Sequence, residues 1–342
     1  MAVTVDFISR LEAKVSEQLR AQRVGFLLGA GSSYLDGRGY PIAAGLWDGI
    51  KDHISDRDVR MEIQEKLDSG AGGIEEALDL LDNGQANETL HRRLVTEAIA
   101  EFFAPMIPPL ETHVEFVRRL ARRPDPSIKI FTLNYDPLIE RAAEKIRVRL
   151  YDGFCGYEHA FFDSSVFEER IGRLQWSFKG KRFQPTARPL LLLKLHGSLG
   201  WYNCDSQDIR RCAFSSLIAN PNERLMIPPQ QRKANETMKQ PYAALWSSFR
   251  GCLGQSTELI NRLVCIGYGF LDEHVNTLVE NALARSDFTL LIFAKQLSNR
   301  AWSKWSTKPN VVAVTEARCS LKGEMGPGHP DLWSFERLSK EV

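Results

Sequence analysis

The sequence predicts an α/β fold: a Rossmann-like parallel sheet with a helical insertion that forms a smaller subdomain. Six short runs have the length of strands and are largely apolar at successive positions, as are strands buried on both faces of a parallel sheet. Segments with helical spacing lie between these runs, an order typical of such sheets. The runs are Val24–Leu28, Ile128–Leu133, Leu190–Leu195, Leu263–Ile266, Thr289–Phe293 and Val311–Val314.

An amphipathic helix is expected before the first strand. Residues 3–22 place Phe7, Leu11, Val15 and Leu19 at helical spacing. Residues 1–22 are therefore predicted to form an N-terminal helix. This helix could pack on the sheet or contact another subunit.

The stretch between the first two strands has helical spacing almost throughout, from about residue 47 to residue 123. Its clearest helices are Ile74–Leu81 and Leu90–Phe103, and glycines at 70–73 and prolines at 105–109 interrupt it. The stretch is too long for a single crossover helix. We therefore expect a helical insertion packed beside the sheet.

Three further helices are expected in the remainder of the chain. They cover Pro137–Ile146, Tyr242–Leu253 and Asp272–Arg285. Asp272 has the side chain of a good N-cap for the last of them.

Irregular excursions are expected at about residues 151–189 and 203–240, which lack a clean period. Residues 23–315 would then form one main domain around the sheet. Residues 316–342 are rich in glycine and proline and are expected to form an irregular C-terminal tail.

Composition and charge narrow the class of protein. The 342 residues are 43% hydrophobic and carry a formal net charge of +1, so nothing indicates direct nucleic-acid binding or an anionic membrane surface. The six cysteines form no C-x-x-C pair, which argues against a structural zinc site and suits a reducing compartment. No signal peptide and no apolar run of membrane-spanning length occur. We expect a cytoplasmic protein without a bound metal.

A glycine-rich motif follows the first strand. In Gly29-Ala30-Gly31-Ser32-Ser33, glycine would let the backbone approach a phosphate, and the serines could donate hydrogen bonds to it. The spacing differs from the G-x-G-x-x-G fingerprint of dinucleotide-binding sheets. A turn that simply requires glycine explains the motif equally well.

A polar pair follows the second strand. Asn134 and Asp136 alternate in direction with Tyr135, so both can reach the crevice at the strand ends while the tyrosine turns away. Ribose hydroxyls or a positioned water would satisfy a buried amide and carboxylate. Asp136 also precedes Pro137 and can cap the following helix.

Two more motifs end strands. His196 is followed by Gly197 and Ser198, and a histidine with its ordinary pKa of about 6.5 suits a general base at neutral pH. After the fourth strand, Gly267–Gly269 would admit a ligand close to the backbone or simply form a turn. Ligands of open α/β sheets bind at the carboxyl ends of strands, so these motifs are expected to meet in one crevice.

In this order, the motifs resemble those of the sirtuin superfamily, and more closely the bacterial sirtuin-like domains of antiphage defence systems. The first motif has the family's G-A-G-x-S form, with Ser33 at the serine position. Gly39-Tyr40-Pro41 resembles the G-I-P element, and residues 132–136 resemble the T-Q-N-I-D element. The late G-T/Y-S element is matched by residues 267–269, with glycine in place of serine.

The resemblance implies a sirtuin-like fold that uses NAD. The family's catalytic asparagine corresponds to Asn134, its catalytic histidine to His196 and its nicotinamide-pocket aspartate to Asp136. The remaining NAD-binding positions that the resemblance implies are Gly29, Ala30, Gly31, Ser32, Ser33, Pro41, Thr132, Gly197, Ser198, Gly267, Tyr268 and Gly269.

One departure from the family bears on the reaction. Deacylating sirtuins carry a four-cysteine zinc module after the histidine, whereas this region has only Cys204 and Cys212. The defence-associated relatives also lack the module and hydrolyse NAD to nicotinamide and ADP-ribose. The resemblance therefore implies an NAD hydrolase that depletes NAD as an antiphage effector. An NAD-dependent protein deacylase and a non-catalytic nucleotide-binding scaffold are the alternatives.

A toxic NAD hydrolase has to be restrained until it is needed. The resemblance accordingly implies a homo-oligomer and a separate partner protein, such as a HerA-like ATPase.

Overall fold

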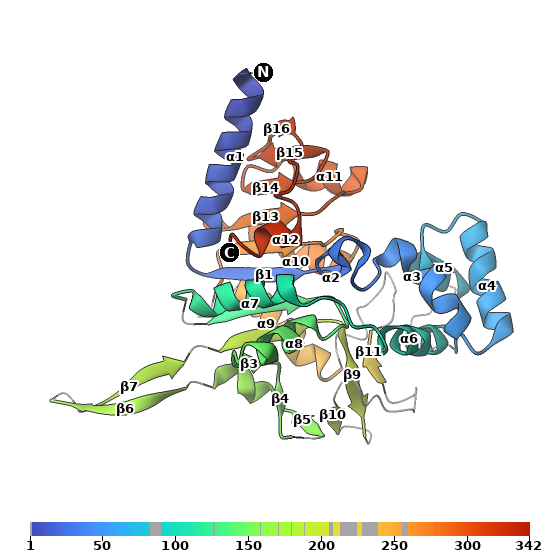
Figure 1. Cartoon of the computed structure of the whole chain (residues 1–342), viewed down its shortest axis with the longest axis horizontal. Helices are drawn as coiled ribbons and strands as arrows, with labels where there is room; N and C mark the ends of the chain where they lie inside the picture. The colour runs from blue at the N-terminus through green and yellow to red at the C-terminus, as the bar shows by residue number, and fades with distance from the viewer. Residues whose placement is uncertain are drawn as a thin grey trace.

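A nine-stranded sheet forms the centre of the molecule (Figure 1). Its strand order is β16-β15-β14-β13-β12-β1-β2-β8-β3. The strands are β1 (Val24–Leu28), β2 (Ile128–Thr132), β3 (Leu150–Tyr151), β8 (Leu190–Lys194), β12 (Arg262–Ile266), β13 (Thr289–Phe293), β14 (Val311–Val314), β15 (Arg318–Leu321) and β16 (Glu324–Pro327). The computed structural model describes residues 2–82, 90–125, 127–157, 159–169, 171–178, 180–187, 189–204, 208–212, 224–227, 239–254 and 259–342.

All the strands predicted from apolar runs lie in this sheet, and neighbours among them pair in parallel. The predicted α/β class is confirmed. From β1 the chain moves outward through β2 to β8, and then returns to β12 on the other side of β1. A topological switch point therefore lies between β1 and β12, the place where open α/β sheets bind ligands.

Residues 316–342 differ from the expected irregular tail. They add β15 and β16 to the edge of the sheet as antiparallel strands and end in the short helix α12 (Phe335–Leu338). β15 contains only two apolar residues, and its buried Ser320 donates a hydrogen bond to the Ser306 carbonyl. This hydrogen bond satisfies a polar side chain that the apolar pattern of a buried strand would not predict.

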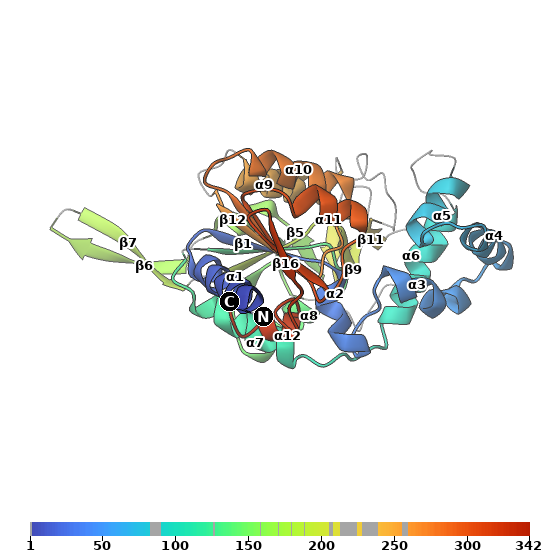
Figure 2. The ribbon, with the colours of Figure 1, turned by 90° about the horizontal axis from the view of Figure 1, so that it is seen from above.

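Helices cover both faces of the sheet (Figure 2). One face is covered by α9 (Tyr242–Leu253), α10 (Glu273–Leu283) and α11 (Asn299–Trp305), and the other by α1 (Ala2–Arg20), α7 (Glu111–Arg122), α8 (Leu138–Lys145) and α12. The apolar residues of α1 join the second of these cores, so this helix packs on the sheet.

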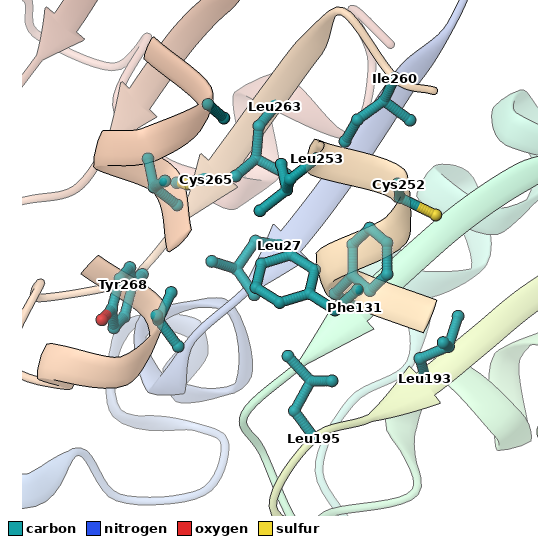
Figure 3. Close-up of a cluster of buried hydrophobic side chains, with 14 of the residues drawn as sticks. Leu27, Phe131, Leu193, Leu195, Cys252, Leu253, Ile260, Leu263, Cys265 and Tyr268 are labelled. Carbon is teal, nitrogen blue, oxygen red and sulfur yellow. The ribbon is translucent and has the colours of Figure 1, made fainter. Parts of the chain in front are cut away.

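Successive strand residues contribute to the two cores in turn. Leu27 belongs to the core under α9 and α10, whereas Phe26 and Leu28 belong to the core under α1 and α7. Figure 3 shows Leu27, Phe131 and Leu195 gathered in the first core. This alternation explains why the parallel strands are apolar at successive positions.

The helices α3 (Ala43–Ile50), α4 (Arg57–Asp68), α5 (Ile74–Leu81) and α6 (Leu90–Phe103) form a subdomain at one end of the molecule, with its own core (Figure 1). The expected insertion reaches residue 123, but α7 packs on the sheet instead. There Phe116 meets Phe26 of β1 edge to face at 5.5 Å. The helices of the insertion itself therefore end at Phe103.

The excursions expected to be irregular contain strands. A five-stranded sheet has the order β11-β9-β10-β5-β4, and β6 (Ile171–Ser177) and β7 (Gly180–Ala187) form a hairpin that projects from the body (Figures 1 and 2). The bounds of the sheet strands are β4 Phe154–Cys155, β5 Ala160–Phe162, β9 Gly197–Asn203, β10 Ile209–Arg211 and β11 Arg224–Met226. Much of the second excursion, 203–240, lies outside the described residues.

None of the described helices is both long and apolar enough to cross a bilayer.

Candidate active site

A cavity of about 970 Å³ lies at the carboxyl ends of the parallel strands. Residues that follow β1, β2, β8, β12, β13 and β14 line it, together with parts of the helical insertion and the C-terminal segment. This volume lies within the range of small-molecule sites. The sequence-predicted residues in its wall are Gly29, Ala30, Gly31, Ser33, Pro41, Asn134, Asp136, His196, Gly267, Tyr268 and Gly269.

The two glycine motifs pack against each other at the switch point. A Cβ on Gly29 would lie 2.7 Å from the Gly267 carbonyl oxygen, and one on Gly31 would lie 2.7 Å from the Gly267 Cα. Gly267 has a φ of +65°, and its own Cβ would lie 2.3 Å from the Ser32 nitrogen. Close approach of the two loops therefore requires these glycines, whether or not a ligand is bound.

The glycine-rich turn, formed by Gly29 and the short helix α2 (Ala30–Tyr34), offers only part of its polar groups to a ligand. The N–H groups of Gly29, Gly31 and Ser32 already donate to backbone carbonyls. The Ser32 and Ser33 hydroxyls donate to a backbone carbonyl and to a carboxylate. The exposed segment Ala30–Gly31 is the part of the turn that faces the cavity most openly.

Asn134 is held by the same turn. Its Nδ2 lies 3.0 Å from the Gly29 carbonyl oxygen and 2.9 Å from Ser33 Oγ, and its backbone N–H donates to Thr132 Oγ1 at 3.0 Å. The Ser33 hydroxyl proton is used elsewhere, so this oxygen accepts a hydrogen bond from Nδ2. The network fixes the side-chain amide and leaves Oδ1 as the acceptor for a molecule in the cavity.

Asp136 connects the turn to helix α8. Its Oδ2 accepts a hydrogen bond from Ser33 Oγ at 2.7 Å, and its Oδ1 accepts one from the Leu138 N–H at 3.1 Å. Asp136 therefore accepts from the first N–H of α8, as its predicted capping role requires, although Pro137 occupies the N-cap position. Tyr135, expected to turn away, also contributes to the cavity wall, while its hydroxyl donates to the Ile227 carbonyl.

His196 is paired with a carboxylate. Its Nε2 lies 3.0 Å from Asp272 Oδ2, and both side chains are almost fully buried. The imidazole stacks on Trp246, with ring centroids 6.3 Å apart. Asp272 Oδ1 accepts a hydrogen bond from the His274 N–H at 3.0 Å, which makes Asp272 the predicted N-cap of α10.

Four predicted residues lie behind the cavity wall rather than in it: Ser32, Thr132, Gly197 and Ser198. Gly197 has a φ of +81°, and a Cβ there would lie 2.3 Å from the Leu225 carbonyl oxygen. The Ser198 hydroxyl donates to the Tyr135 carbonyl at 3.2 Å. These contacts show that Gly197 and Ser198 pack within the structure around the strand ends.

Several wall residues were not predicted as site residues. The sequence predicts Asp272 only as a helix cap, although its place just after β12 put it at the same sheet edge as His196. Tyr40, next to Pro41, and Glu75 of the insertion also line the cavity, as does the C-terminal segment 333–336. The sequence contains no periodic pattern that would predict contact of that segment, or of the insertion, with the strand ends.

Among the described residues, no three or more His, Cys, Asp or Glu side chains are grouped so that they could hold a metal ion. Cys204 is exposed and Cys212 is partly buried, and neither forms a disulfide.

The sequence model of the SIR2-like domain family matches residues 128–310, more than half of the chain. The matched part includes Asn134, Asp136, His196 and the glycines after β12, but not the turn after β1. The chain therefore belongs to the SIR2-like domain family.

Comparison with solved structures finds Sir2 homologues. A triple mutant of a Sir2 homologue in complex with 2'-O-acetyl ADP-ribose is 13% identical, with a TM-score of 0.42 over 96% of this chain and 93% of that chain. A mutant Sir2 homologue in complex with ADP-ribose is 15% identical, with a TM-score of 0.45 over the same shares. No curated protein matches the sequence.

Proposed function

We propose that this protein hydrolyses NAD to nicotinamide and ADP-ribose in the cavity at the switch point. The observation that carries the proposal is that Asn134 and His196 share one cavity wall, each held in place by hydrogen bonds. Membership of the SIR2-like domain family supports NAD as the substrate.

The chemistry requires few groups. Hydrolysis breaks the bond between the ribose C1′ and the nicotinamide nitrogen, and a water oxygen forms the new bond to C1′. The nicotinamide ring is cationic before it leaves, so it departs neutral without a general acid. Positive charge develops at C1′ in the transition state. The two flanking carboxylates of ordinary glycosidases are therefore unnecessary.

The proposed roles follow from the hydrogen bonds of each side chain. Asn134 Oδ1 accepts a hydrogen bond from the attacking water or from a ribose hydroxyl. His196 accepts the proton that the water or ribose releases, while Asp272 orients the imidazole and stabilises its protonated form. Asp136 orients the ribose or the nicotinamide carboxamide.

The cavity has the extent that a dinucleotide needs. Its wall residues follow strands from β8 across β2, β1, β12 and β13 to β14, five inter-strand spacings, or about 24 Å along the sheet edge. The segment Ala30–Gly31 lies midway and is proposed to face the pyrophosphate, together with the wall cations Arg38 and Lys295. Pro41 and the loop 267–269 complete the binding surface.

The biological role is also a proposal. The resemblance to defence-associated relatives supports an antiphage effector that depletes NAD, acts in the cytoplasm and is controlled by a partner such as a HerA-like ATPase. It also supports homo-oligomerisation.

The β6–β7 hairpin is the surface that we propose for contact with a second copy. Leu174 pairs with Phe183 across the hairpin, and Trp176 lies two residues along on the same face. Their exposed fractions are 64%, 42% and 78%. An isolated two-stranded hairpin is marginally stable in water. A twofold axis would bring the same apolar face of both copies together.

The experiment that tests the proposed activity separates the candidate functions by their products. Purified protein is incubated with NAD, with and without an acetyl-lysine peptide, and the products are resolved by liquid chromatography. A hydrolase yields nicotinamide and ADP-ribose at the same rate in both. O-acetyl-ADP-ribose formed only with the peptide would establish a deacylase instead, and bound but intact NAD would establish a scaffold. Addition of the proposed partner, such as a HerA-like ATPase, to the same assay tests whether the partner activates NAD hydrolysis.

A further inference from the structure

Lys194 places a cation inside an apolar strand. It is the last residue of β8, its neighbours from Leu190 to Leu195 are all leucines, and its side chain is 1% exposed. A buried charge destabilises the folded protein unless it is paired, and apolar residues of similar volume can often replace a buried ion pair without loss of stability. A lysine at this position therefore calls for a role that a leucine could not fill.

The ammonium of Lys194 makes three hydrogen bonds, which use its three donors. Two of them reach consecutive backbone carbonyls of the loop after β2: Nζ lies 2.6 Å from the Asp136 carbonyl oxygen and 3.3 Å from the Tyr135 carbonyl oxygen. The third reaches Glu140 Oε1 of α8 at 2.9 Å, so the charge is paired. Lys194 thus binds the backbone of the loop that presents Asn134 and Asp136 to the cavity.

The position of this loop sets the position of the Asn134 amide. The Asp136 carboxylate accepts a hydrogen bond from Ser33 Oγ at 2.7 Å, and Ser33 Oγ accepts one from Asn134 Nδ2 at 2.9 Å. A shift of the Asp136 backbone would therefore pass through Ser33 to Asn134. The Tyr135 carbonyl, which directly follows Asn134, also accepts from Ser198 Oγ at 3.2 Å. Lys194 is accordingly linked to Asn134 through both residues that follow it.

We propose that Lys194 is a positioning residue for NAD hydrolysis: its ammonium fixes the Tyr135 and Asp136 carbonyls and thereby directs Asn134 Oδ1 toward the reacting ribose. This inference rests on the proposed hydrolysis. Lys194 is not part of the cavity wall, so it acts through Asn134 rather than on the substrate. Displacement of a reacting group by about 1 Å can cost about 100-fold in rate. Loss of the ammonium should therefore lower turnover without weakening binding.

The test compares Lys194→Met with Lys129→Met. Lys129 is a matched control, because it is a buried lysine of the neighbouring strand β2, where it pairs with Leu191, three residues before Lys194. In Lys194→Met, we expect kcat for nicotinamide release to fall about 10- to 100-fold and the Kd for ADP-ribose, measured by calorimetry, to stay the same. Lys129→Met should keep the wild-type kcat.

A double-mutant cycle separates positioning from a structural role. Because Lys194 is proposed to act through Asn134, adding Lys194→Met to Asn134→Ala should lower turnover by less than about threefold more. A second variant combines Lys194→Met with Glu140→Gln and so removes the carboxylate charge that has lost its cation. Its Tm should recover toward that of the wild type, while its kcat stays as low as in Lys194→Met. A kcat that recovers together with the Tm would show a structural role and overturn the inference.

A spectroscopic signature tests the position of Asn134 without turnover. The NMR signals of its side-chain amide, assigned in 15N-labelled protein by their absence in Asn134→Ala, should shift in Lys194→Met but not in Lys129→Met. Unchanged signals in Lys194→Met, or fully additive losses in the cycle, would also overturn the inference. Failure of the proposed hydrolysis has a different signature: the wild type would release no nicotinamide, while the Asn134 signals would still shift in Lys194→Met.

Discussion

His196 Nε2 lies 3.0 Å from Asp272 Oδ2, and the other oxygen of the same carboxylate accepts hydrogen bonds from the first turn of α10. One side chain therefore sets both the orientation of the imidazole and the start of a helix. The two tasks can be separated by substitution.

Asp272→Asn keeps an oxygen that can cap α10 but removes the charge beside His196. We expect turnover of NAD to fall about 100-fold or more. Asp272→Ala should lose as much turnover and, in addition, about 1 kcal/mol of unfolding free energy through loss of the cap. Steady-state rates and urea unfolding measure both. Wild-type turnover in Asp272→Asn would remove this pair from the mechanism.

Asn134→Asp tests the direction of the side-chain amide. The variant places a carboxylate oxygen where Nδ2 now donates to the Gly29 carbonyl, and it leaves two acceptors facing each other. We expect turnover to fall about 100-fold or more, and the unfolding free energy to drop by about 2 kcal/mol. Retained stability and activity in Asn134→Asp would show that this amide does not donate to the turn.

Gly267→Ala tests the contact between the two glycine motifs. The new Cβ would clash with the turn after β1 and occupy a left-handed backbone position, so we expect a loss of about 2 kcal/mol or more in urea unfolding. Gly269 is a matched control in the same loop, because a Cβ added there would meet Leu271 Cγ at 3.8 Å, an ordinary van der Waals distance. Gly269→Ala should change stability by less than about 0.5 kcal/mol. Equal effects of the two substitutions would contradict the packing account.

Buried His113 makes stability depend on pH. Burial lowers the pKa of His113 to about 3, whereas a histidine in an unfolded chain has a pKa of about 6.5. Between these values the unfolded state binds a proton that the native state does not. Stability therefore rises with pH across this window and is lost as the pH falls below about 6.5, by about 2 kcal/mol at pH 5.

His113→Phe should abolish this part of the pH dependence, measured by urea unfolding between pH 7 and pH 4. His53→Phe is the control, because His53 is exposed. In this variant the unfolding free energy should depend on pH as it does in the wild type. If the unfolding free energy of His113→Phe depended on pH as strongly as that of the wild type, another group would have to cause the loss of stability at low pH.

The hairpin contact predicts a change in assembly. The double substitution Trp176→Ser and Phe183→Ser removes apolar surface from one hairpin face, and it should shift sedimentation toward a smaller species. Arg173→Ser lies on the opposite face and should leave the assembly unchanged. Identical sedimentation of all three proteins would place any subunit contact elsewhere.

Much of the sheet could be predicted because burial on both faces leaves a continuous apolar run. The runs at Thr289–Phe293 and Val311–Val314 have the bounds of β13 and β14. The same rule fails for β15, where a hydrogen bond to the Ser306 carbonyl allows buried Ser320. It also fails for β6 and β7, which project from the body as a hairpin (Figure 1).

Only those site residues that directly follow a core strand could be predicted from the sequence. Asn134, Asp136 and His196 follow core strands, so their common edge follows from topology. The partnership of His196 with Asp272 depends on how α10 packs, and Tyr40 enters the wall through its contact with Phe103 of the insertion. Neither contact leaves a local pattern in the sequence.

The most direct test of the central claim compares wild type and Asn134→Ala with NAD, measuring nicotinamide release by chromatography and NAD affinity by calorimetry. The account predicts release from the wild type, a loss of about 100-fold or more in the variant, and similar NAD affinity in both. Near-normal release by Asn134→Ala would contradict the assignment of hydrolysis to this cavity.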